Sequence, residues 1–578
     1  MIILRILKNI ILFFIKEIIK IGILLFILGV GIMYTINYFS KTKEIKPIEN
    51  NSYLELNLAN GYNESGTNPL DYFSTDKTID FYTLLSSITK AKNDNRIDGI
   101  FINLENSALN KSQVEELGQK LLEFKKSGKK IYAYGANLDN NNYNIAIYAN
   151  EIIMPPSASA TVNITGFYNQ IPYFKNLSNL VGVKFNVIHV GDYKSYGENY
   201  VKNEMSHEFK ENMLRIYDKV YNNFVGDIAK ERQLSSDNIN EKILNGDLMV
   251  ATPYDLIKNN LIDKMEYLNN IKEELGKDNF VKIEDYGREK NISSENDQSP
   301  AIALIYLNGD INYNDDSRNL TNKITPKTFA DKFQEALDDD DIKGIVLRVN
   351  SPGGSALASE IIYNQIKASS KPVYISIGRV AASGGYYISS AGKKIFADRD
   401  SITGSIGVVS LIPNIQELVH KLHINLQTLE KGKFASIYSL TNNFTEEDKE
   451  KMYKANEEVY KEFLERVSSS RGISVEELNK IAQGRVWLGE EAVNIGLVDQ
   501  IGGIEDTISA MGEDLSLEKY RVKEIKTDES INNFISSYMG PVLEVKNIIY
   551  GEKADVILKN IKNNELYFKP TTYFPYEI

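Results

Sequence analysis

Ser383 has the surroundings of a nucleophile in this 578-residue chain. It stands in RVAASGGYYISS (379–390), between two alanines and two glycines, where the strand-like run KPVYISIG (371–378) ends and a helical stretch begins. Small neighbours leave room for another molecule to approach the hydroxyl closely. The same pattern is also typical of an ordinary Ser-Gly turn, so this stretch alone leaves both interpretations open.

A serine hydroxyl attacks efficiently only when a base accepts its proton. None of the four histidines stands in a glycine-rich turn; they are His189, His207, His420 and His423. A lysine can act instead where its surroundings favour the neutral amine. Lys194 follows an apolar run in FNVIHVGDYKSYG (185–197), which is consistent with partial burial. It is the candidate base, and an ordinary surface lysine is the alternative.

Two further small-residue clusters precede and follow Ser383. VNSPGGSALASEII (349–362) places Gly353 and Gly354 between a strand and a helix, where backbone N–H groups can face a developing oxyanion. The amide of Gly384 would be another donor. TGSIG (403–407) contains Ser405, which could hydrogen-bond the lysine. The lysine and spacing of a phosphate-binding loop are absent.

The chain contains an internal repeat. RIDGIFINLEN (96–106) matches DIKGIVLRVNS (341–351), KKIYAYG (129–135) matches KPVYISIG, and the helical stretches 211–232 and 450–471 also match. Such self-similarity indicates two copies of one structural unit. Each copy alternates strand-like and helical stretches, which predicts an α/β fold with βαβ crossovers.

The two copies have lost complementary residues. Aligning the copies puts Ser383 opposite Asn141, so the first copy lacks the serine. It also puts Lys194 opposite Ala435, so the second copy lacks the lysine. We therefore predict one composite site, in which the first copy supplies Lys194 and the second supplies Ser383. We expect it to form within one chain, because tethering makes the encounter intramolecular. The mirror-image pair, Asn141 and Ala435, would be a vestigial site.

The N-terminal region has the composition of a membrane anchor. The uncharged apolar run IGILLFILGVGIMYTINYF (21–39) is long enough to span a bilayer as a helix, and a slight excess of positive charge before it favours a cytoplasmic N-terminus. We predict an anchor over 1–46, a first α/β repeat over 50–285, a second over 299–520 and a tail over 521–578. The polar stretch 286–299 would link the repeats.

Composition excludes several functional classes. The net charge of −12, without a concentrated basic stripe, argues against a nucleic-acid-binding surface. The absence of cysteine excludes disulfides, thiol nucleophiles and cysteine-ligated zinc. We expect neither a metal nor a cofactor.

Four stretches together resemble a known family: VNSPGGS, AASGGYYIS, TGSIGV and GRVWLGEEAVNIGLVD (484–499). They resemble signal peptide peptidase A in its long, two-repeat form, the protease IV type, over roughly residues 50 to 515. The resemblance implies a fold like those of Clp protease and the crotonases. It implies Ser383 as nucleophile, Lys194 as general base, Ser405 as the residue that orients the lysine, and a glycine-lined oxyanion hole. It also implies a membrane-attached homotetramer, and it leaves the tail ELYFKPTTYFPYEI (565–578) unassigned.

Three functions remain to be compared. The first is a serine endopeptidase of the bacterial cytoplasmic membrane, with its catalytic body outside the cytoplasm, that degrades cleaved signal peptides and other short apolar peptides. The second is a crotonase-like enzyme acting on acyl-CoA thioesters. The third is a non-catalytic membrane scaffold, which would be expected to lack Ser383 or Lys194. Covalent labelling of Ser383 by a serine-reactive probe distinguishes the first function from the second.

Overall fold

The computed structural model describes residues 48–64, 79–294, 298–314, 323–526 and 571–573, together with Lys20 and Gly31. The predicted membrane run 21–39 lies outside the described residues except for Gly31. Within the described ranges, no helix is both long enough and apolar enough to cross a membrane.

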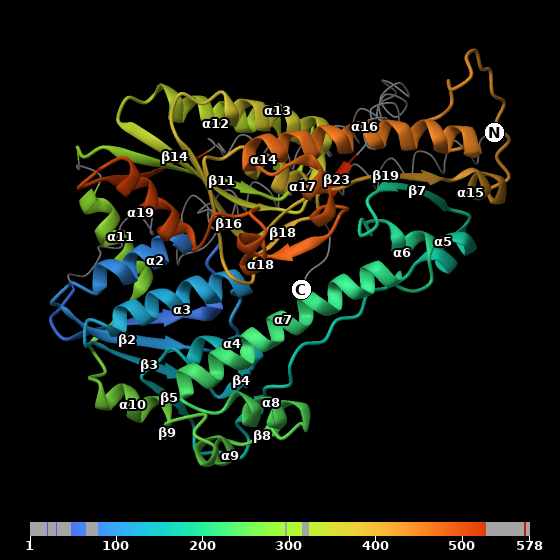
Figure 1. Cartoon of the computed structure of the whole chain (residues 1–578). Coiled ribbons are helices and arrows are strands. Elements are labelled where there is room, and N and C mark those ends of the chain that lie inside the picture. Colours follow the sequence, from blue (N-terminus) through green and yellow to red (C-terminus); the bar gives the residue numbers. More distant parts are fainter. Residues whose placement is uncertain are drawn as a thin grey trace.

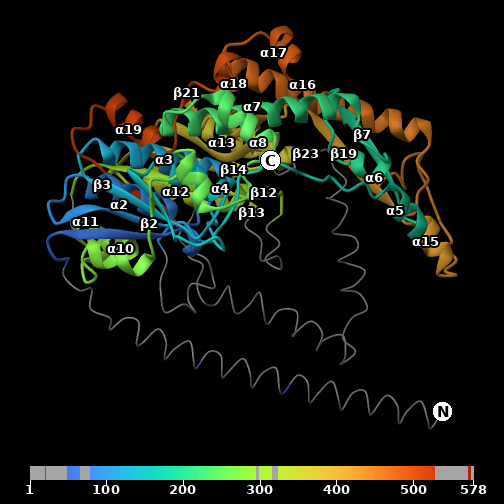
Figure 2. The same ribbon diagram turned by 90° about the horizontal axis from the view of Figure 1, so that it is seen from below.

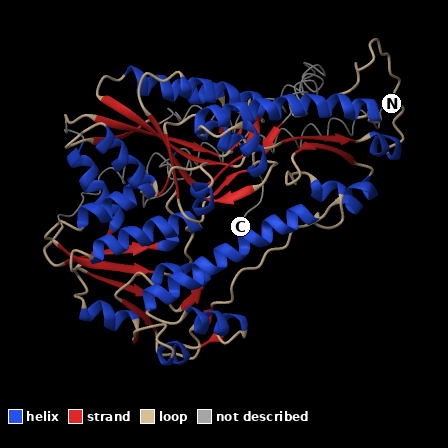
Figure 3. Cartoon of the chain, in the orientation of Figure 1, coloured by secondary structure: helices blue, strands red, loops and turns tan. Residues whose placement is uncertain are grey.

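The first repeat is built on a six-stranded parallel sheet. Its strand order is β10-β1-β2-β3-β5-β9, and helices such as α2 and α3 provide the crossovers (Figures 1 and 3). The strands are β1 (Ser52–Asn57), β2 (Ile97–Asn103), β3 (Lys130–Tyr134), β5 (Glu151–Met154), β9 (Lys264–Met265) and β10 (Phe280–Lys282). The other elements of this half are η1 (Leu58–Asn60), α2 (Phe81–Ala91), α3 (Lys111–Lys125), β4 (Asn137–Asp139), α4 (Asn140–Ala146), β6 (Thr161–Asn163), α8 (Ser236–Leu244), β8 (Met249–Ala251), α9 (Pro253–Lys258) and α10 (Leu268–Glu274).

The second repeat has the same strand order. Its parallel pairs run β22-β11-β14-β16-β17-β21, and each strand corresponds by position to one of the first sheet. The strands are β11 (Ala301–Asn308), β14 (Ile342–Ser351), β16 (Val373–Ala382), β17 (Lys394–Ala397), β21 (Gln500–Ile501) and β22 (Arg521–Glu524). The other elements are α12 (Pro326–Asp338), α13 (Ala356–Lys367), α14 (Gly384–Ser389), β18 (Ile402–Gly404), α17 (Val475–Ile481), β20 (Val486–Leu488), α18 (Gly489–Asn494) and α19 (Ile504–Asp514). The predicted α/β fold in two tandem repeats is confirmed.

A third sheet joins the repeats. Strand β7 (Lys184–Val190) of the first repeat pairs antiparallel with β19 (Val408–Asn414) of the second, with Val190 opposite Val408. With α5 (Lys175–Val181), α6 (Glu198–Val201) and α15 (Gln416–Lys421), these strands form an arm that extends from the body (Figures 1 and 2). Through β23 (Thr571–Tyr573), which pairs with β19, the sheet continues to β15 (Gly353–Ser355), β12 (Asp310–Ile311) and β13 (Lys323–Ile324).

Two long helices correspond to the matched helical stretches of the sequence. They are α7 (His207–Arg232) and α16 (Glu446–Arg471), and each ends in a left-handed residue, Gln233 and Gly472. Asn456 of α16 fixes the arm to the body. Its Nδ2 donates to the Ile188 carbonyl (2.7 Å), and its Oδ1 accepts from the Ser410 hydroxyl (2.9 Å). One side chain thereby ties β7 to β19.

The predicted linker over 286–299 is wrong for most of its length, because α11 (Ile283–Ser294) extends through it. Ile283 and Tyr286 are fully buried, and Gly287 packs closely on Ser87 of α2. The segment is mostly polar in composition, which indicated a linker. Its few apolar residues lie on one buried face and therefore support a helix.

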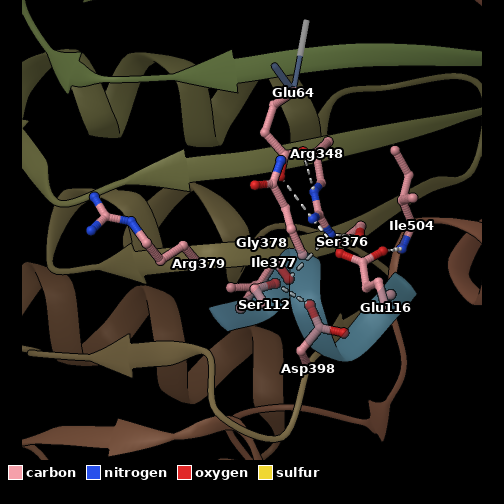
Figure 4. A network of polar contacts seen from close by, with 12 residues as sticks. Glu64, Ser112, Glu116, Arg348, Ser376, Ile377, Gly378, Arg379, Asp398 and Ile504 are labelled. Carbon is pink, nitrogen blue, oxygen red and sulfur yellow. Dashed lines mark hydrogen bonds and ion pairs between the residues drawn. The ribbon is translucent and has the colours of Figure 1, made fainter. Parts of the chain in front are cut away.

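The repeats also meet through a buried ionic cluster (Figure 4). Arg348 of β14 is fully buried and forms ion pairs with Glu116 of α3 and with Glu64, the latter at 3.0 Å. Its guanidinium also donates to Ser376 Oγ (2.9 Å), and Glu116 accepts from the Ile504 amide (2.7 Å). Because Glu64 and Glu116 come from the first repeat and Arg348 from the second, the cluster fixes the repeats to one another.

Candidate active site

Ser383 occupies a sharp turn between β16 and α14. Its backbone has φ 56° and ψ −120°, a conformation that non-glycine residues rarely adopt and that costs on the order of 1–3 kcal/mol. Two hydrogen bonds maintain the turn: the Ser383 amide donates to the Gly404 carbonyl (2.8 Å), and the Tyr387 amide donates to the Ser383 carbonyl (2.8 Å). A strained strand-to-helix turn of this kind presents a nucleophile at the edge of a sheet.

Lys194 lies directly against this serine. Its Nζ is 2.6 Å from Ser383 Oγ, 3.0 Å from Ser405 Oγ and 3.0 Å from the Ser405 carbonyl oxygen. All three residues are buried, with Lys194 only 3% exposed. The structure thus brings together, within one chain, the three side chains that the sequence singled out.

Burial favours the uncharged form of the lysine. Removal from water lowers the pKa of Lys194 well below its usual value, and no carboxylate in the described part of the chain forms an ion pair with it. A neutral amine has two N–H donors and one lone pair. The Ser405 hydroxyl and carbonyl can accept both donors, which leaves the lone pair to accept the Ser383 proton. The arrangement therefore suits a general base.

The turn that carries Lys194 is fixed by residues 483–485, which the sequence interpretation did not assign to the site. The Tyr193 amide donates to the Gln483 carbonyl (2.8 Å), and the Ser405 amide donates to the Arg485 carbonyl (2.7 Å). A Cβ added at Gly484 would lie 2.6 Å from the Lys194 amide nitrogen, so only glycine allows this approach. One short segment therefore sets the positions of both Lys194 and Ser405.

The missed segment did have a signal in the sequence. Gly484 and Arg485 begin GRVWLGEEAVNIGLVD, one of the stretches that carried the family resemblance. The Arg485 guanidinium also lies 3.8 Å from the centre of the Tyr193 ring, a cation–π contact next to the lysine. In the sequence this stretch carries the family resemblance but indicates no role for its individual residues.

The predicted oxyanion glycines lie beside the serine with different local roles. Gly384 is the first residue of α14, so its amide has no acceptor inside the helix. The Gly353 amide donates to Ser351 Oγ (3.2 Å), a bond that an oxyanion would have to replace. Gly354 pairs with Ile311 of β12, and a Cβ there would overlap the Ile311 carbonyl. Gly354 is therefore required for packing, whatever its part in catalysis.

The other candidates lie elsewhere. None of the four histidines, all of which are described, forms a hydrogen bond with Ser383; His189 Nδ1 instead lies 3.1 Å from the Gly191 carbonyl oxygen. Asn141 of α4 lines a cavity of about 550 Å³, whereas Ala435 is exposed in the loop between α15 and α16. The structure does not bring this mirror-image pair together. Among the described residues, no cluster of acidic and histidine side chains could hold a metal ion.

Comparison with known proteins identifies the family of the chain. Residues 123–282 and 365–518 each match Peptidase family S49. Protease 4 of Salmonella typhi is 30% identical over 79% of this chain and 76% of its own. Protease 4 of Haemophilus influenzae is 31% identical over 75% of this chain and 72% of its own. The chloroplastic serine protease SPPA of Arabidopsis thaliana is 30% identical over 74% of this chain and 64% of its own. The chain belongs to peptidase family S49 and is a serine peptidase of the two-repeat, protease 4 type.

Proposed function

We propose that the chain cleaves peptide bonds with a serine–lysine dyad in which Ser383 is the nucleophile and Lys194 the general base. The observation that carries this proposal is the 2.6 Å contact between a buried lysine amine and a serine in a strained turn. In the described part of the chain, this amine forms no ion pair with a carboxylate. Because burial lowers the pKa of such a lysine, a larger fraction of it is neutral and able to accept a proton than of a solvated lysine at the same pH.

The reaction follows from these positions. Lys194 accepts the Ser383 proton while Oγ attacks the substrate carbonyl, and the amide N–H groups of Gly384 and Gly353 stabilise the oxyanion. The resulting ammonium then donates its proton to the leaving amine. Water, deprotonated by the same lysine, hydrolyses the acyl-enzyme and restores Ser383. Ser405 keeps the amine aimed at the serine through its hydroxyl and carbonyl.

The proposed substrates are cleaved signal peptides and other short apolar peptides. One relative, 34% identical over 217 residues, is named a putative signal peptide peptidase of Enterococcus faecium. The apolar run 21–39 supports attachment to the bacterial cytoplasmic membrane by one span, with the catalytic body outside the cytoplasm. Assembly as a homotetramer remains part of the proposal, on the basis of the family resemblance.

The proposed topology has a direct test. Protease added to intact spheroplasts should digest the body of the chain and leave its N-terminal segment protected. Digestion only after lysis would place the body in the cytoplasm and contradict the proposed topology.

The activity test uses detergent-solubilised protein and a synthetic signal peptide. Ser383→Ala should reduce kcat by at least about 10⁴-fold, because the nucleophile is lost while alanine fits the turn. The matched control is Ser390→Ala, another buried serine, whose hydroxyl donates to the Tyr387 carbonyl (2.7 Å). Equal turnover by both variants would exclude Ser383 as nucleophile. Turnover of an acyl-CoA thioester without peptide hydrolysis would favour the crotonase-like alternative, and a correctly folded protein without either activity would favour the scaffold.

A further inference from the structure

Arg485 lies between the turn that carries Lys194 and the long helix α7. Its guanidinium is 3.8 Å from the centre of the Tyr193 ring, and Tyr193 directly precedes Lys194 in the chain. Its Nη1 lies 3.6 Å from Oε1 of Glu211, a residue of α7. The Tyr193 hydroxyl donates to the same carboxylate (3.4 Å). The arginine of the second repeat is therefore held between an aromatic ring and a carboxylate of the first.

The backbone of Arg485 holds the other neighbour of the lysine. Its carbonyl accepts from the Ser405 amide (2.7 Å), and the backbone of Ser405 is left-handed, with φ 52°. This conformation is uncommon for a residue other than glycine, so the hydrogen bond helps to maintain it. It thereby keeps the Ser405 hydroxyl and carbonyl within reach of Lys194 Nζ. Arg485 thus restrains one neighbour of the lysine by its side chain and the other by its backbone.

The first repeat provides an internal comparison. Its stretch NGDLMV matches QGRVWL of the second repeat, which aligns Gly246 with Gly484. Asp247 then stands in the place of Arg485. The two glycines have nearly the same φ, 78° and 77°. A Cβ at Gly246 would have no atom of the described chain within 4 Å, whereas a Cβ at Gly484 would lie 2.6 Å from the Lys194 amide nitrogen. The arginine therefore occurs in the copy on which a lysine turn packs.

A cation packed on the Tyr193 ring restrains the lysine turn. The Arg485 side chain is only 20% exposed, and a cation–π attraction is stronger where water is largely excluded. Because Tyr193 and Lys194 are adjacent in the chain, fixing the ring also fixes the main chain of the lysine. Proton transfer depends on the distance between the amine and the serine hydroxyl, and small displacements of a reacting group lower the rate strongly.

We propose that Arg485 is a positioning residue for Lys194: its guanidinium, held by Glu211, packs on the Tyr193 ring and keeps the lysine turn closed against Ser383. This inference rests on the proposed function and adds to it a residue that acts on the general base without contacting the reacting atoms. If the turn loosened, the amine would move away from the serine and water would reach it. Because burial lowers the pKa of Lys194, entry of water would raise that pKa again.

The test measures the rate at which Ser383 reacts with a serine-directed phosphonylating probe, as a function of pH, in the full chain. Arg485→Met removes the guanidinium and keeps an unbranched side chain. It should lower the rate at neutral pH by about tenfold, and the rise of the rate should move to higher pH because the lysine is less buried. The control is Arg521→Met on β22, which removes an arginine of similar exposure that pairs with Asp341 (2.9 Å). Its profile should match that of the wild type.

Two further variants test whether the arginine acts through the ring. Arg485→Lys should retain more of the rate than Arg485→Met, because an ammonium can also pack on the Tyr193 ring. Tyr193→Leu removes the ring instead and should move the pH profile in the same direction. In the double variant of Arg485→Met and Tyr193→Leu, the two effects should be less than additive, since both remove one contact. Full additivity would overturn the proposal.

The same measurements separate this inference from the proposed function. If Ser383 of the wild type is not labelled, or is labelled equally at every pH, the dyad is overturned and this inference with it. If the wild-type rate rises with pH and Arg485→Met has the same profile, the dyad stands and the role of Arg485 is overturned. A lower rate with an unmoved profile would also overturn that role, because it would indicate general loosening of the fold. Thermal midpoints show which variants are folded during labelling, and Tyr193→Leu decides the question if Arg485→Met is not.

Discussion

Lys194 Nζ and Ser383 Oγ lie 2.6 Å apart although 189 positions separate the two residues in the chain. Each repeat has kept one of the pair: Asn141 replaces the serine in the first, and Ala435 replaces the lysine in the second. The pairing of β7 with β19 carries the lysine turn across to the serine. The proposed site therefore combines one residue from each repeat.

The pH dependence of hydrolysis should follow the titration of Lys194. Only the neutral amine can accept the serine proton, so activity should rise with pH through the lysine pKa. Because burial lowers the pKa of Lys194 well below its usual value, the rise should be complete well below about pH 10.4. The measurement is kcat/KM against pH with a chromogenic peptide. A rise centred near pH 10 would mean that the lysine is solvated.

Replacement of Lys194 should change how stability depends on pH. With its folded pKa lowered, the native chain binds fewer protons than the unfolded chain between that pKa and about pH 10.4, so wild-type stability rises with pH across this window. Lys194→Met is uncharged and similar in length, so it lacks this contribution. The thermal midpoint of the wild type, measured relative to that of Lys194→Met, should therefore increase with pH across the window. If the thermal midpoints of the two proteins changed with pH in parallel, the lysine would not be buried in its neutral form.

In the proposed mechanism Ser405 is a positioning residue that acts through Lys194. Ser405→Ala should lower kcat by about 10–100-fold with little change in KM, a smaller effect than loss of the base itself. Its hydroxyl is also an acceptor for the ammonium, so removing it should lower the lysine pKa further and shift the acidic limb of the pH profile to lower pH. The control is Thr403→Val, because the Thr403 hydroxyl donates to the Ala381 carbonyl (2.8 Å) and not to Lys194. A reduced rate with an unshifted profile would indicate a purely structural role.

The ionic cluster between the repeats should be essential for stability. Arg348→Met leaves the buried Glu116 carboxylate without its guanidinium, which should cost about 3–5 kcal/mol of unfolding free energy. Lys454→Met, which breaks an exposed ion pair with Glu450, is the control and should leave the midpoint unchanged. Denaturant unfolding of the three proteins checks both expectations. A stable Arg348→Met would show that packing alone holds the repeats together.

The sequence was sufficient to predict the two repeats. The complementary losses at Asn141 and Ala435, visible in an alignment of the chain with itself, also led to the hypothesis of one site composed of Ser383 and Lys194. The segment around Gly484 contributes to the family resemblance, but its structural role was not predicted, because its contacts with Lys194 cross some 290 positions. The ion pair of Arg348 with Glu116 was missed for the same reason. Residues 571–573 looked like an unassigned tail, and only strand pairing with Gly353 revealed their position.

Covalent labelling tests the dyad most directly. Wild type, Lys194→Met and Ser390→Ala are each treated with a serine-reactive phosphonylating probe at neutral pH, and the modified residue is identified by peptide mass spectrometry. The account predicts an adduct on Ser383 in the wild type and in Ser390→Ala, and little or none in Lys194→Met, because the hydroxyl then has no base. Equal labelling of Ser383 with and without Lys194, or an adduct on another serine, would contradict it.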